Sequence, residues 1–181
     1  MTWNERFMEL FRRCVERYHG GDSEFDNYYS KEDREFLREI GYKPRELFDF
    51  VEDLVDEGEP DETTALLIAG ARRDYLTVMQ KNRLSDHEIT RDDLPTFGDL
   101  LDGVAYLPRI ITKARAKLRG ELDPDLMFGC GGDRNFFREH GEIHPADFLR
   151  TVWAAGDDDQ RILAYVRECA SRGANAELLN S

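Results

Sequence analysis

The chain has 181 residues, of which 40% are hydrophobic and 35% are charged, a composition typical of globular proteins and not of disordered ones. Its formal net charge of −13 would repel nucleic acids and anionic membranes, so we expect neither as a partner. The three cysteines (Cys14, Cys130 and Cys169) form no CxxC pair, the N-terminus lacks the pattern of a signal peptide, and no apolar run has membrane-spanning length. These features favour reduced thiols and a cytoplasmic protein.

The first half, residues 1–81, is predicted to be an N-terminal helical bundle. Thr2 and Glu5 have the spacing of a capping box, in which each side chain binds a free backbone N–H group of the first turn, and they begin the first helix. Ser30 begins the second helix, and Pro44 suits the first turn of the third. Apolar residues recur at helical spacing in all three, so each helix is predicted to bury one face.

The fourth predicted helix, residues 62–81, begins after Asp61 and is apolar on nearly every side, which predicts a position in the middle of the bundle. Within the run Arg72-Arg73-Asp74, Arg73 lies on the same side of this helix as Leu66 and Ala69, so we expect at least one charge of the run to point inward. A buried charge needs a partner. Arg73 is therefore predicted to pair with a carboxylate, and the alternative is that it binds a ligand.

The periodicity fades over residues 82–102, where Asp, Pro and Gly accumulate, and we predict a linker or a long surface loop there. Residues 103–172 are predicted to form a C-terminal helical domain, and residues 173–181 a frayed tail. The predicted fold is mainly α, with two packed helical halves and at most a minor short-strand element around residues 126–129.

The helix expected at residues 105–119 is basic, with no acidic residue between Gly103 and Gly120. Its charges fall on both flanks of a narrow apolar seam, where aliphatic stems can cover the seam while the charged groups reach water. One hypothesis is a site for phosphate or another acidic ligand, with Arg109 as a binding residue. The alternatives are a solvated face, or a partner for the acidic stretch at residues 46–62. The basic residues are Arg109, Lys113, Arg115, Lys117 and Arg119.

A glycine-rich loop, Gly129-Cys130-Gly131-Gly132-Asp133-Arg134-Asn135, is predicted to lead into a helix. A helix N-terminus directs backbone N–H groups at an anion and stabilises negative charge on a nearby thiol. Cys130 and Asp133 are therefore candidate catalytic residues, and Arg134 is a candidate for binding an anionic substrate. The alternative is a glycine turn with a small buried cysteine and an aspartate that caps the helix.

The histidines suggest a metal site that the spacing does not favour. His140 and His144 are four residues apart, but the intervening glycine and the following proline interrupt a helix across them. Together with Cys130 and Asp133 they match no zinc pattern, so we predict no metal. The chain also lacks the glycine-rich nucleotide motifs, and we predict no cofactor.

Three segments of the second half, within roughly residues 95–168, carry a family resemblance. They are Gly103-Val104-Ala105-Tyr106-Leu107-Pro108-Arg109-Ile110-Ile111-Thr112-Lys113-Ala114-Arg115-Ala116, then Cys130-Gly131-Gly132-Asp133-Arg134-Asn135-Phe136-Phe137, and Asp147-Phe148-Leu149 through Ile162-Leu163. In these segments the chain resembles a small bacterial family, domain of unknown function 5069. The family usually has Pro-Leu between the cysteine and the aspartate, where this chain has two glycines. The resemblance implies no particular reaction, and it directs attention to Arg109, Cys130 and Asp133.

No motif in the sequence names a reaction, so the function stays unknown at this level and three hypotheses remain. The first is a soluble helical interaction protein, with a homodimer as one form of it, in which the acidic first half and the basic helix meet within or between chains. The second is a small-molecule site, with an enzyme as one form of it, built from Cys130, Asp133 and Arg134 with Arg109 nearby. The third is a module that binds a small anionic ligand without catalysis.

Overall fold

The computed structural model describes residues 1–179, and it describes side chains as far as Ala174. Within these residues the chain forms eight α-helices, two short 3-10 helices and one two-stranded sheet, so the prediction of a mainly α fold is confirmed. The elements are α1 (Trp3–His19), η1 (Phe25–Asn27), α2 (Lys31–Glu39), α3 (Pro44–Glu57), α4 (Glu62–Val78), η2 (Arg91–Asp93), β1 (Leu100–Leu101), β2 (Val104–Ala105), α5 (Leu107–Arg119), α6 (Gly131–Glu139), α7 (Pro145–Ala155) and α8 (Asp159–Leu179).

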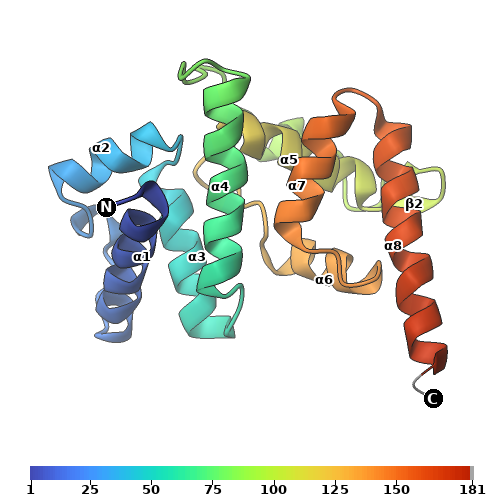
Figure 1. Ribbon diagram of the computed structural model, residues 1–181, viewed down its shortest axis with the longest axis horizontal. Helices are drawn as coiled ribbons and strands as arrows, with labels where there is room; N and C mark the ends of the chain where they lie inside the picture. The colour runs from blue at the N-terminus through green and yellow to red at the C-terminus, as the bar shows by residue number, and fades with distance from the viewer. Residues whose placement is uncertain (180–181) are drawn as a thin grey trace.

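Helix α4 lies in the middle of the molecule, between α1–α3 on one side and α5–α8 on the other (Figure 1). It packs against α1, α5 and α7, as its apolar composition predicted. Asp61 caps it by accepting a hydrogen bond from the Thr64 amide at 2.7 Å. The buried apolar residues of both halves belong to one continuous core.

The inward-pointing arginine of α4 is Arg72, so the prediction that at least one charge of the run Arg72-Arg73-Asp74 points inward is confirmed, although the buried residue is not Arg73, whose position suggested it. Arg72 continues the buried face formed by Ile68, Ala69 and Leu76, at spacings of four and three residues. Its guanidinium donates to the Gly41 carbonyl at 3.0 Å and to a carbonyl at the end of α5, that of Leu118, at 2.8 Å. The buried arginine also donates to Gln80 Oε1 at 2.7 Å, and its two backbone partners lie at helix ends of different halves, so it connects the halves.

The one small sheet of the described residues lies at residues 100–105, so the prediction of at most a minor strand element is confirmed, but it does not lie around residues 126–129. Asp102 and Gly103 both have positive φ and form the two-residue turn that an Asp-Gly hairpin favours. In the predicted strand region, the Leu126 amide instead closes a turn onto the Asp123 carbonyl, and Gly129 has a φ of +90°. Positive φ interrupts an extended chain, so residues 126–129 cannot continue a ladder.

The segment between the halves is attached to the second half. The Ile89 amide donates to the Glu121 carbonyl at 2.7 Å, and the Asp123 amide donates to the Ile89 carbonyl at 3.0 Å. The carboxylate of Glu88 also pairs with Lys43 at 2.8 Å. These contacts tie the long loop predicted at residues 82–102 to both halves.

Helix α8 continues to Leu179, beyond Gly173, where a frayed tail was predicted. The last two residues of that predicted tail, 180 and 181, lie outside the described part of the chain. No helix within the described residues combines the length and the apolarity that a membrane crossing requires.

Candidate functional site

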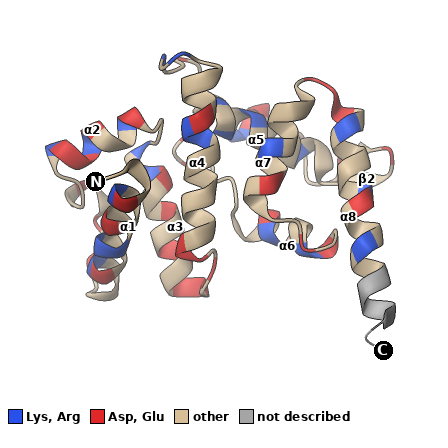
Figure 2. Cartoon of the chain, in the orientation of Figure 1, with Lys and Arg blue, Asp and Glu red and all other residues tan. Residues whose placement is uncertain are grey.

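Three of the basic residues of α5 lie in one row and are buried. Arg109, Lys113 and Lys117 follow one another at four-residue intervals, and each is less than a tenth exposed. The expectation that the charges of α5 reach water was therefore wrong for these three. Figure 2 shows the blue segments of α5 at the back of the molecule, among the other helices. Buried cations need partners, and each of the three finds a different one.

Lys113 joins the two candidate catalytic residues. Its ammonium donates to Asp133 Oδ2 at 2.6 Å and to Cys130 Sγ at 3.3 Å. Asp133 is fully buried, and it also accepts the Gly129 amide at 2.8 Å. Asp133 thus fixes the position of the Lys113 ammonium, and the ammonium places a positive charge beside the sulfur of Cys130.

Tyr106 completes the set of contacts around Asp133. Its hydroxyl donates to Asp133 Oδ1 at 2.7 Å, and burial, followed by the charge of Asp133, raises the pKa of the phenol. The hairpin before α5 positions this residue, because the Tyr106 amide donates to the Asp99 carbonyl at 3.2 Å and its φ is +69°. A Cβ atom at Gly132 would lie 3.1 Å from the hydroxyl oxygen, so the absence of a side chain there allows Tyr106 to approach. We name Cys130, Lys113, Asp133 and Tyr106 the thiol cluster.

Arg109 supports this cluster from outside. Its guanidinium donates to the Pro95 carbonyl at 2.7 Å and lies 4.3 Å from the ring centroid of Phe97. The Phe97 ring in turn stacks on Tyr106, with ring centroids 5.9 Å apart. Arg109, the predicted binding residue, thus holds the segment that covers Tyr106.

The thiol cluster lies close to solvent. Cys130 is half-buried, Gly132 is exposed, and Cys130 is the N-cap of α6. The amide N–H groups of the first helical turn have no partners inside a helix, and they carry the positive end of its dipole. A small molecule at the sulfur would therefore meet Lys113 and the start of α6, both of which favour negative charge.

The Arg134 guanidinium lies outside the thiol cluster. Its guanidinium donates to Asp53 at 2.7 Å and to the Gly129 carbonyl at 2.8 Å, and it also pairs with Glu57 and Glu59. Burial opposes its charge, but the hydrogen bond to Asp53 and the neighbouring carboxylates outweigh burial and raise the pKa of the guanidinium. The acidic stretch of the first half has already neutralised Arg134, which leaves it poorly suited to a further anion.

Arg73 and the two histidines also lie outside the thiol cluster. The Arg73 guanidinium lies 5.1 Å from the centroid of the Trp3 ring. His140 stacks on Phe136 with centroids 4.1 Å apart, and His144 caps α7 by accepting from the Ala146 amide at 3.2 Å. Among the side chains that the structure describes, no three histidine, cysteine or carboxylate groups converge as metal ligands would.

Cys130 and Asp133 were predicted as site residues from the sequence, whereas Lys113 and Tyr106 were not. The spacing contained a usable signal, because Tyr106 and Lys113 are seven residues apart and therefore share one face of a helix. The spacing does not show which way that face points. The face that carries Tyr106 and Lys113 points toward α6 because of the way the second half packs.

One family model matches part of the chain. Residues 95–180 match the model of a family described as Domain of unknown function (DUF5069). The second half of the chain is similar to this family. The resemblance predicted from the Leu-Pro-Arg and Cys-x-x-Asp-x-x-Phe elements is thereby confirmed, and both elements contribute to the thiol cluster or its support. No curated protein and no solved structure matches the chain.

Proposed function

We propose that the second half of the chain holds a thiol site, in which Cys130 reacts with a small electrophilic molecule that carries negative charge. The observation that supports this most is the 3.3 Å contact between the Lys113 ammonium and the Cys130 sulfur. A thiolate is the nucleophilic form of cysteine, and both an adjacent cation and a helix N-terminus stabilise it. The half-buried position of the sulfur gives it access to small molecules.

In this proposal each residue has a distinct role. Cys130 forms the bond to the substrate, and Lys113 stabilises negative charge on the sulfur and on the incoming molecule. Asp133 positions Lys113, and Tyr106 positions Asp133. The sulfur attacks an electrophilic carbon, the leaving group departs with the electron pair of its bond, and the thiol proton goes to water.

The test is site-resolved alkylation at neutral pH, with each cysteine followed by peptide mass spectrometry. We expect Cys130 to react with iodoacetamide about tenfold faster than glutathione does, because the Lys113 ammonium and the start of α6 lie beside the sulfur. The ratio of the Cys130 rate to the glutathione rate should be higher still with iodoacetate, because iodoacetate carries the negative charge that Lys113 favours. Cys14 is the internal control, since burial raises the pKa of its thiol to about 12 and should leave it unreactive.

Two results would overturn the proposal. One is a Cys130 rate no higher than that of glutathione. The other is a preference for iodoacetamide over iodoacetate equal to that of glutathione, because a site that ignores the charge of the probe is not an anion site.

We retain a homo-oligomeric interaction protein as a second proposal. Its support is the exposure of Phe97 and Leu100, at 65% and 63%, on the hairpin segment beside the thiol cluster. The pairing of acidic and basic segments that first suggested it occurs within one chain, between Lys117 and Glu46. Light scattering across a salt series tests the oligomer, and a monomer at every salt concentration would exclude it.

A cytoplasmic location is part of the first proposal. A reactive thiol needs a reducing compartment to remain unmodified. Cys14, Cys130 and Cys169 are all free thiols in the structure, which suits such a compartment.

A further inference from the structure

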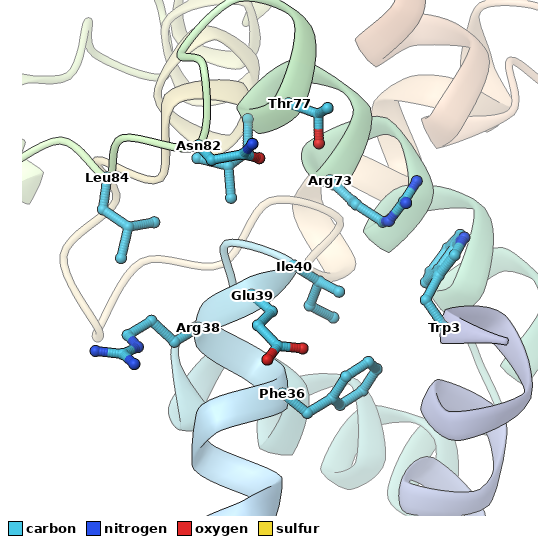
Figure 3. A pocket seen from close by; sticks show the side chains of 10 residues that line it. Trp3, Phe36, Arg38, Glu39, Ile40, Arg73, Thr77, Asn82 and Leu84 are labelled. Atoms are coloured by element: carbon cyan, nitrogen blue, oxygen red, sulfur yellow. The ribbon is translucent and has the colours of Figure 1, made fainter. Parts of the chain in front are cut away.

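The large cleft of the first half offers no pair of side chains that could react with each other. It has a volume of about 740 Å³ and lies between α1, α2, α4 and the segment that follows α4 (Figure 3). Arg38 and Arg73 lie at opposite sides of it and point away from each other, with Glu39 between them (Figure 3). None of its described lining residues is a cysteine or a lysine. A lysine and a cysteine do meet in the thiol cluster.

Two nucleophiles contact each other there, and they differ in their access to solvent. The Lys113 ammonium lies 3.3 Å from the Cys130 sulfur. The Lys113 side chain is only 5% exposed, and Asp133, its ion-pair partner at 2.6 Å, is fully buried. Cys130 is half-buried, so small solutes can reach its sulfur. An oxidant from solvent therefore meets the sulfur first, on the side away from the buried Lys113.

No second cysteine lies where it could react with an oxidised Cys130. An oxidised thiol can condense with another thiol, but a disulfide requires Cα atoms within about 7 Å of each other. Cys169 lies against Gly141, beyond the C-terminal end of α6, and Cys130 lies at the N-terminal end. The nine residues of α6 separate these ends by about 13 Å. Cys14 lies in α1, across α4 from α6 (Figure 1). Among the described side chains, Lys113 is the nucleophile in position.

We infer that Cys130 and Lys113 form a reversible covalent cross-link, a sulfenamide, when a hydroperoxide oxidises the thiol. A sulfenic acid condenses with nitrogen in this way. The inference rests on the proposed function, since it concerns the same sulfur, and it names how that site is regulated. While the cross-link exists, the sulfur cannot react with an electrophile, and a reducing thiol restores both residues.

The first step oxidises the sulfur. The Cys130 thiolate attacks the outer oxygen of the hydroperoxide, and the O–O bond breaks with its electron pair on the leaving oxygen. The proton that the thiol released completes the leaving alcohol, or water when the oxidant is hydrogen peroxide. The product is a sulfenic acid whose oxygen lies on the solvent side, opposite Lys113.

The second step forms the S–N bond. The Lys113 ammonium gives one proton to Asp133, which already accepts its hydrogen bond, and the nitrogen attacks the sulfur opposite the oxygen. The S–O bond breaks, and the hydroxide takes a second proton from the nitrogen and leaves as water. The buried ammonium and carboxylate thus become a neutral sulfenamide and a neutral carboxylic acid. Burial opposes charge, so the interior position of Lys113 and Asp133 favours this product.

The test is peptide mass spectrometry of the full chain after brief exposure to hydrogen peroxide at neutral pH. Trypsin cleaves after a free Lys113 but not after a cross-linked one. We expect residues 110–115 joined to residues 120–134, with a mass lower by two hydrogen atoms than the sum of the two peptides, and separation of the peptides by dithiothreitol. Lys117 is the internal control, because it is buried in the same helix beside Glu46 and should remain a cleavage site.

Lys113→Arg is the matched variant. Arginine keeps a positive charge beside the sulfur, but it is not deprotonated in proteins and cannot form the S–N bond. Without the cross-link, the sulfenic acid is open to further oxidation. After peroxide and then dithiothreitol, we expect at least about twofold more sulfinic acid at Cys130 in Lys113→Arg than in the unsubstituted chain. Circular dichroism checks the fold, and the peptides of the unsubstituted chain decide the inference if this variant does not fold.

Two results would overturn the inference. One is oxidation of Cys130 to sulfenic or sulfinic acid while trypsin still cleaves after Lys113. The other is a loss of two hydrogen atoms within residues 120–134 alone, which would place the S–N bond on the Gly131 amide.

Alkylation rates measured before oxidation keep this inference and the proposed function apart. Rapid alkylation of Cys130 without a later cross-link would overturn the inference alone. A cross-link at a thiol that alkylates no faster than glutathione would overturn the proposed function alone.

Discussion

Two lysine–carboxylate pairs lie one turn apart on α5, and they differ in what surrounds them. Lys117 pairs with Glu46 at 2.9 Å, and its ammonium lies 3.9 Å from the centroid of the Tyr42 ring. Lys113 pairs with Asp133 at 2.6 Å, and its ammonium also contacts the sulfur of Cys130. Both lysines are almost entirely buried.

Burial of the ion pair is common to both, so burial by itself does not support a functional role for either pair. Lys117 is enclosed by aromatic rings and joins the two halves, and burial lowers the pKa of its ammonium against the opposing effect of Glu46. Lys113 has the same chemistry but stands beside a half-buried thiol and an exposed glycine. The reactive group within its reach, and the access of solvent to that group, distinguish the second pair.

The largest effect is expected when the ion pair between Lys117 and Glu46 is broken. Lys117→Met leaves the Glu46 carboxylate buried without its cation, and we expect the free energy of unfolding to fall by about 3–5 kcal/mol in urea denaturation. Arg119→Met, which removes an exposed charge from the same helix, should change it by less than about 0.5 kcal/mol. The double variant Lys117→Met/Glu46→Leu should recover much of the loss. If Lys117→Met costs no more than Arg119→Met, the pair does not join the halves.

The next effect concerns Asp49, which lies three residues after Glu46 on α3 and pairs with Arg45 instead of a buried lysine. Burial raises the pKa of Asp49 to about 6 from the usual 3.8, although Arg45 opposes the shift. The folded chain therefore holds this proton more tightly than the unfolded chain does. The resulting stabilisation is full below pH 3.8 and is lost as the pH rises through about 6.

Asp49→Asn should accordingly be more favourable at high pH. We expect its effect on the free energy of unfolding to be about 2 kcal/mol more stabilising at about pH 8 than at about pH 4. Urea denaturation of both proteins at the two pH values measures this difference. An effect that does not vary with pH would show that Asp49 has an ordinary pKa.

The third effect tests the functional side of the comparison. Lys113→Met/Asp133→Asn, which leaves no unpaired buried carboxylate, should lower the alkylation rate of Cys130 about tenfold, because it removes the positive charge beside the sulfur. Arg119→Met and Lys117→Met/Glu46→Leu are the controls, since both alter charge on α5 without touching the thiol cluster. Equal rates in all of these variants would make Lys113 a structural residue like Lys117.

The smallest effect concerns Gly132. Gly132→Ala places a methyl group against the Tyr106 hydroxyl, which must shift by a few tenths of an ångström. We expect a loss of less than about 1 kcal/mol in unfolding and a measurable change in Cys130 alkylation, because Tyr106 helps to hold Asp133. Gly98→Ala, where a Cβ atom meets nothing within 4 Å, is the control. Identical alkylation in the two variants would remove Tyr106 from the site.

Local signals predicted much of the helical fold. Ser30 and Asp61 cap helices where expected, because capping depends on residues three positions apart. The position of the small sheet was not predicted, for a different reason. Asp102-Gly103 is a strong turn signal, but the flanking strands have only two residues each, too few for a visible alternation.

The sequence by itself determined the helices, the central place of α4, and the candidates Cys130 and Asp133, because these depend on spacing along the chain. The tertiary structure alone decided which charges are buried. Helical spacing places Arg72 and Arg73 on adjacent directions of α4, and only the packing of α5 and the Gly41 turn made Arg72 the inward one. In the same way, Lys113 and Lys117 look alike in sequence. Their different surroundings come from residues 20 and 71 positions away, which no local pattern can place.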